Sequence, residues 1–116
     1  MKGELDVQEI VSDYNKYISN ISSGSEYIYT LIRNGEIQEV MQPIINFSEG
    51  MGWIISVNNY MKTLEVNLGI DENKLQNILL ELNNALDMQD FYLAADLFEY
   101  EIKEFFENLS EIKINN

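Results

Sequence analysis

Two carboxylates in the last third of the chain have the spacing of side chains that could act together. Asp96 and Glu99 are three residues apart, so on a helix they share one face, and Tyr92 precedes Asp96 by four residues on the same side. Tyr100 and Glu101 follow directly. Such a cluster could bind a cation or a small molecule, or serve as an acid and base pair. The structural alternative is a solvated acidic face, or a buried Asp–Tyr hydrogen bond that joins two helices.

The residue types that usually accompany carboxylates in catalytic and metal sites are missing from the sequence. It contains no histidine and no cysteine, which removes the usual general base, thiol chemistry and the Glu-x-x-His pairs of di-metal bundles. The segment from Asp87 to Asp96 lacks the alternating carboxylates and the glycine of a calcium loop. A Ser-x-x-Lys pair, Ser110 and Lys113, lies in the expected tail without companion motifs. We therefore expect no enzyme activity, no metal and no cofactor, and we expect packing to explain the cluster.

The elements that would position this cluster are helices, because apolar residues recur three, four or seven positions apart along the chain. The first helix is predicted over residues 5–34, with Gly24 as a point of bending or breakage, and it ends at Asn34-Gly35. The second is predicted over residues 36–67. Pro43 predicts a kink or a short break in it, because proline removes a backbone donor and clashes with the preceding turn.

Two shorter helices are predicted after these. Asp71 and Asp90 are the expected N-caps, and the third helix ends near Met88. A flexible tail is expected from about residue 110 to residue 116. Short connections favour antiparallel neighbours. The sequence therefore predicts one all-α domain over residues 1–116, an antiparallel bundle of about four helices, two long (one kinked near Pro43) and two shorter.

The segment Gly50-Met51-Gly52-Trp53 resembles a fragment of a nucleotide-binding loop only in its two glycines. No strand precedes it and no lysine follows closely, so both the dinucleotide and the P-loop interpretations fail. We interpret the glycines as allowing close approach of a neighbouring backbone or aromatic ring. Trp53, the only tryptophan, is then expected in the core or at its rim, whereas an exposed Trp53 would indicate a binding hot spot.

Charge and aromatic content restrict the classes of partner. Twenty acidic and seven basic side chains give a net charge of −13, which disfavours nucleic acid and anionic membranes. Among seven tyrosines, Tyr27 and Tyr29 flank Ile28, so at least one points away from the core and suggests a contact surface. Neither a signal peptide nor a transmembrane run is evident. We expect a cytoplasmic bacterial protein.

Part of the chain resembles a family of proteins. The stretch from Asn83 to Phe106, with its run Asp-Phe-Tyr-Leu-Ala-Ala-Asp-Leu-Phe-Glu-Tyr-Glu, is similar to the C-terminal helix pair of an uncharacterised family of small acidic helical proteins from low-GC Gram-positive bacteria. The Gly50-Trp53 segment resembles that family's middle part, so the likeness covers about residues 45–107. The family implies no activity. In size, acidity and helical content the chain also resembles flagellar and type III export chaperones, without a shared motif.

The sequence thus predicts a non-enzymatic protein-interaction module, adaptor or chaperone-like, that binds a basic or amphipathic helical segment of another protein. Two alternatives stay open: a bundle that binds a small molecule or cation through the Asp/Glu/Tyr cluster, and a structural homodimer. The candidate interaction residues are Trp53, Tyr92, Asp96, Glu99, Tyr100 and Glu101.

Overall fold

The computed structural model describes the backbone of residues 2–113 and the side chains of residues 7–113. Its elements are α1 (Lys2–Arg33), α2 (Ile37–Thr63), α3 (Glu72–Asp87), α4 (Phe91–Asp96), the π-helix η1 (Leu97–Ile102) and α5 (Lys103–Glu107). The last three follow one another without a break. The described chain therefore forms four helical segments without a strand, which confirms the predicted all-α bundle.

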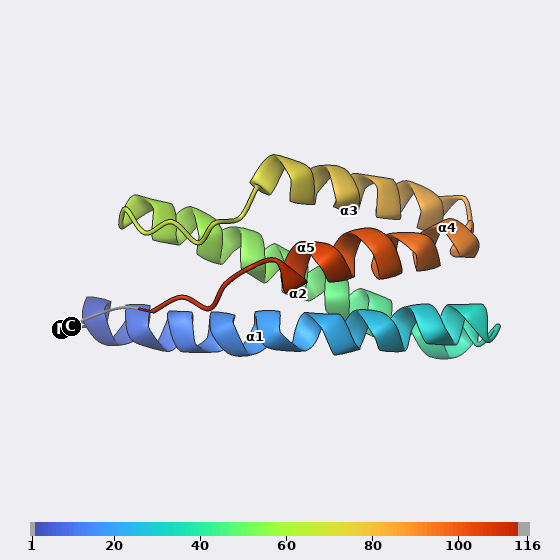
Figure 1. Cartoon of the computed structure of the whole chain (residues 1–116), viewed down its shortest axis with the longest axis horizontal. Helices are drawn as coiled ribbons and strands as arrows, with labels where there is room; N and C mark the ends of the chain where they lie inside the picture. The colour runs from blue at the N-terminus through green and yellow to red at the C-terminus, as the bar shows by residue number, and fades with distance from the viewer. Residues whose placement is uncertain (1, 114–116) are drawn as a thin grey trace.

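The helix α1 is the common partner of most of the fold. Consecutive segments run in opposite directions, and α1 extends along the long axis of a molecule measuring 49 × 23 × 22 Å (Figure 1). It contacts α2 and also α4, η1 and α5, whereas α3 packs against α4 and η1. The buried side chains form one core; the largest fully buried ones include Tyr14, Met51, Ile54, Leu75, Leu82 and Phe98.

Both long helices are continuous where the sequence allowed an interruption. The helix α1 passes through Gly24, and α2 passes through Pro43 without the short break that was considered. Buried residues of α2 recur at intervals of three and four from Val40 to Met61, with Val57 and its neighbour Asn58 both buried, so one unbroken face covers the core. The burial of that whole stripe keeps α2 helical even though Pro43 removes one intrahelical hydrogen bond.

Three helix ends share one hydrogen-bonding motif. After α1, Glu36 N–H donates to the Leu31 carbonyl and Gly35 N–H donates to the Ile32 carbonyl, a Schellman motif with Gly35 at φ 77°. The ends of α2 and α3 repeat it with Glu65 at φ 61° and Gln89 at φ 55°. Because these two residues carry a Cβ, they hold the left-handed conformation at a conformational cost that glycine does not have. The second helix consequently ends at Thr63, earlier than residue 67.

The predicted N-caps are confirmed. Asp71 Oδ1 accepts a hydrogen bond from Lys74 N–H and Asp90 Oδ1 accepts one from Leu93 N–H, each at 3.1 Å. Each cap satisfies an amide in the first turn of a helix that has no intrahelical partner.

The π-helix η1 was not predicted from the sequence. Ala94, Phe98, Ile102 and Phe106 recur every four residues and are all buried. In an α-helix of 3.6 residues per turn, each four-residue step rotates the side chain by about 40°, so this row would drift off the core. The wider i→i+5 turn absorbs the drift and keeps all four side chains inward.

The segment after α5 is held on α1, although the sequence suggested a flexible tail from about residue 110. Asn15 Nδ2 donates to the Ile112 carbonyl at 2.8 Å, and Ile112 N–H donates to Asn15 Oδ1 at 2.9 Å. This pair satisfies both backbone groups of Ile112. The bonds to Asn15 fix the position of Ile112 on α1, the flexibility of the tail stays a prediction, and residues 114–116 of that tail lie outside the described residues.

Candidate functional site

The two carboxylates singled out from the sequence meet at one arginine. Arg33, the last residue of α1, places Nη2 at 3.0 Å from Asp96 Oδ1 and at 2.6 Å from Glu99 Oε1. The hydrogen bond to Asp96 and the charge of Glu99 raise the pKa of the guanidinium above its ordinary value. The Arg33 guanidinium carbon also lies 5.8 Å from the centroid of the Tyr29 ring.

The ion pairs of Arg33 occupy the two carboxylates on which the cation-binding alternative depends. Asp96 and Glu99 share a face as predicted, but an internal cation already lies between them. Among the described residues, no group of three or more acidic side chains is placed to hold a metal ion. The arrangement therefore ties the end of α1 to η1 and offers no convergent oxygen ligands to a second cation.

The two tyrosines of the cluster point into solvent. Tyr92 and Tyr100 are 82% and 61% exposed, and with Asp96 between them at four-residue spacing they follow one outer row of the last helical segment. In residues 7–113 neither tyrosine forms a hydrogen bond with a carboxylate, so the buried Asp–Tyr pair considered from the sequence does not form. Met88, in the turn before α4, is 78% exposed as well.

Glu101 and Trp53 lie apart from that row. Glu101 borders a shallow polar hollow whose other residues, among them Asp71 and Glu81, belong to the start and middle of α3. Trp53 lies on α2, with its ring edge-on to Tyr17 at a centroid distance of 5.8 Å. The structure thus divides the six candidate residues among three places.

Trp53 is an exposed side chain of α2, which is the alternative that sequence reasoning linked to a binding hot spot. Its exposed fraction is 37%, so the side chain is anchored on one side by Tyr17 and accessible on the other. Gly50 lies beneath the Tyr17 hydroxyl, where a Cβ would collide with it, whereas Gly52 faces open space. The close-approach interpretation is therefore confirmed for Gly50 and is wrong for Gly52.

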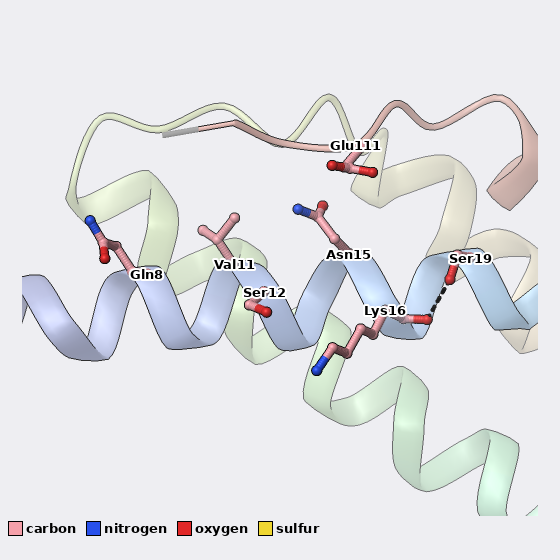
Figure 2. A pocket seen from close by; sticks show the side chains of 7 residues that line it. All are labelled: Gln8, Val11, Ser12, Asn15, Lys16, Ser19 and Glu111. Carbon is pink, nitrogen blue, oxygen red and sulfur yellow. Dashed lines mark hydrogen bonds between the residues drawn. The ribbon is translucent and has the colours of Figure 1, made fainter. Parts of the chain in front are cut away.

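A polar hollow that sequence reasoning missed lies where the C-terminal segment runs alongside α1 (Figure 2). It has a volume of about 460 Å³ and is lined by Gln8, Val11, Ser12, Asn15, Lys16 and Ser19 of α1 and by Glu111. Asn15 is already bonded to Ile112, and Ser19 Oγ donates to the Lys16 carbonyl at 2.8 Å. The remaining groups carry mixed charge and do not form a nucleophile–base pair. No signal in the sequence distinguished Asn15 from an ordinary surface asparagine.

The described helices include none that is long and apolar enough to cross a membrane. The sequence model of a family described as Domain of unknown function (DUF8042) matches residues 9–112. The chain has no match among curated proteins and none among solved structures. The family match does not test the resemblances to acidic proteins of low-GC Gram-positive bacteria or to export chaperones, which stay predictions.

Proposed function

The chain belongs to the DUF8042 family, and we propose that it is a non-enzymatic, cytoplasmic protein-interaction module that binds a basic amphipathic helical segment of another protein. The proposed contact surface, called here the Tyr92 surface, consists of Met88, Tyr92, Asp96 and Tyr100. The observation that carries the proposal is the exposure of Tyr92 and Tyr100 along one row of an acidic helix.

The exposed aromatic side chains supply contact area for a partner. Tyrosine is enriched in interface hot spots because it buries a large amphipathic ring at low conformational cost. Tyr92 and Tyr100 are separated by eight residues, about two helical turns, which matches the spacing of apolar residues on one face of a partner helix.

The charge around this surface indicates the sign of the charge expected on the partner. Residues 80–107 contain eight acidic side chains and one lysine, a net charge of −7 for the segment. Arg33 reaches in from α1 and compensates part of it at Asp96 and Glu99. The remaining negative potential favours encounter with a basic segment and disfavours anionic partners such as nucleic acid or anionic membranes.

The test places a photo-crosslinking amino acid at position 92 in the native host and identifies what it captures. We expect one specific partner with a basic amphipathic helix, whose purified peptide binds the chain with an affinity that falls as salt is raised. The double variant Tyr92→Ala/Tyr100→Ala should weaken that binding at least about tenfold, since each truncation removes a hot-spot side chain.

Tyr60→Ala is the matched control, because Tyr60 is 40% exposed on α2 and lies outside the Tyr92 surface. It should leave the affinity unchanged. A chain that stays monomeric by light scattering and captures no specific protein at position 92 would overturn the proposal. A doubled mass that the double variant reduces to a monomer would replace it with the homodimer alternative.

A further inference from the structure

An apolar groove of about 350 Å³ lies between α1 and α2 and shares no residue with the Tyr92 surface. On α1, its lining follows the helical spacing 17, 20, 21, 24, 27 and 28, so these positions form one stripe of the helix. Gly24 is in the middle of that stripe, and a Cβ built there meets no atom within 4 Å. Pro43 and Phe47 of α2 line the opposite wall. The groove exists because the central position of the stripe has no side chain.

The lining of this groove contains no charged side chain, although the chain carries a net charge of −13. Three other hollows of the described surface each contain charged residues, for example Lys16 with Glu111, or Glu9 with Asp13. An ion entering the groove would lose hydration without gaining a counter-charge. The groove therefore selects for a neutral occupant.

One buried hydroxyl group in the lining lacks a partner. Ser25 is 2% exposed, and its Oγ forms no hydrogen bond in the structure. A buried hydroxyl without a partner is destabilising, because it has lost its hydrogen bonds to water and has not replaced them. Asn20 and Asn46 add amide groups to the same lining. A ligand with one hydrogen-bonding group that reaches Ser25 would satisfy a hydroxyl that the protein itself leaves without a partner, whereas Asn46 Oδ1 already accepts a hydrogen bond from Gln42 Nε2 at 3.0 Å.

We propose that the α1/α2 groove is a binding site for a neutral, mainly aromatic small molecule that carries a hydroxyl or similar hydrogen-bonding group. The volume is within the range of small-molecule pockets, and sites between the helices of a bundle are common. Tyr17, Tyr27 and Phe47 supply aromatic surface, and Ser25 supplies the hydrogen-bonding group. This inference does not depend on the Tyr92 surface.

The protein contains its own reporter for this site. Trp53 contacts Tyr17, and Tyr17 lines the groove, so an occupant that moves Tyr17 alters the emission of the only tryptophan. The probe is benzyl alcohol, which is neutral, aromatic and carries one hydroxyl. We expect a saturable change in Trp53 emission with a dissociation constant on the order of 1 mM, an affinity well below the ligand-efficiency ceiling for a molecule of this size.

Two comparison probes test the chemistry. Toluene, which lacks the hydroxyl, should bind several-fold more weakly if Ser25 contributes a hydrogen bond. Benzylamine, which is cationic at neutral pH, should also bind more weakly, even though the net charge of the protein attracts it. Tighter binding of benzylamine than of benzyl alcohol would overturn the proposal.

The substitution Gly24→Leu fills the groove from its centre and should weaken benzyl alcohol binding at least about tenfold. Gly52→Leu is the matched control, because it makes the same change in an open helical position outside the groove. Amide chemical shifts of the unmodified protein give a readout independent of both variants. Shift changes should map to residues 17–28 and 43–47.

Several outcomes would refute the site. Absence of saturable emission change together with absence of shift changes in those residues refutes it, as does equal loss of binding in Gly24→Leu and Gly52→Leu. A dimer that Gly24→Leu dissociates would show that a second copy of the chain fills the groove, and it would also overturn the small-molecule proposal.

Discussion

Replacing Gly50 with alanine should destabilise the protein, although alanine is the better helix former. Both glycines of α2 after Pro43 lie in the helix interior, where a Gly→Ala change contributes about 1 kcal/mol of stability through propensity. At Gly52 nothing lies within 4 Å of the new Cβ, so this gain is realised. At Gly50 the Cβ collides with the end of the Tyr17 ring, which is held by Trp53. Overpacking of this kind costs about 1 to 3 kcal/mol.

We therefore expect Gly52→Ala to be more stable than Gly50→Ala by about 1 to 3 kcal/mol. Urea unfolding followed by far-UV circular dichroism measures the difference, and Trp53 emission reports the displacement of Tyr17. In a Tyr17→Leu background the collision is relieved, so Gly50→Ala should become stabilising by about 1 kcal/mol. Equal stability of Gly50→Ala and Gly52→Ala in the original background would refute the packing of Tyr17 on Gly50.

Three further predictions follow from buried or strained groups. Burial raises the pKa of Tyr14 from 10.0 to about 12, so the folded state favours the neutral phenol. The stability that this raised pKa contributes is complete below pH 10 and is lost as the pH rises toward 12. The substitution Tyr14→Phe removes an unpartnered buried hydroxyl and should leave the free energy of unfolding unchanged or raise it. It should also make the free energy of unfolding depend less on pH in the alkaline range. Asn15→Ala should cost about 1 to 2 kcal/mol and accelerate hydrogen exchange at Ile112, and unchanged exchange would contradict the clamp on the C-terminal segment. Gln89→Gly should stabilise by up to about 1 kcal/mol in thermal unfolding because it relieves the left-handed conformation, and a lower melting temperature would contradict this.

The helices and their caps could be predicted from the sequence because their signals are local. Apolar spacing gave the four segments, and the roles of Asp71, Asp90 and Gly35 depend only on residues within one or two turns. The π-helix was not predicted, since four-residue spacing of buried positions can also be read as an ordinary helix whose apolar face drifts. Only the packing of the whole row against the core decides between the two.

The candidate site was predictable only in part, because some of its contacts join residues that are distant in the sequence. The shared face of Asp96 and Glu99 follows from their three-residue spacing. Their counter-ion, Arg33, is more than sixty residues away, at the end of another helix. Nothing in the local sequence of Arg33 or of Asn15 shows which distant group it will contact. Contacts of this kind arise from the crossing of helices, which the apolar pattern leaves undetermined.

The central position of α1 has a consequence for how the chain folds. Its hydrogen bonds to the last part of the chain join residues 97 positions apart, and its packing against α5 spans most of the chain. Until the segment from α4 to Ile112 is synthesised, α1 can bury only the apolar side chains that contact α2, and its remaining apolar side chains stay exposed to solvent. Because such contacts between distant residues slow folding, we expect this domain to fold more slowly than helical bundles of similar size built from local contacts. Truncated chains that end before α5 should aggregate, since they leave some of these apolar side chains uncovered.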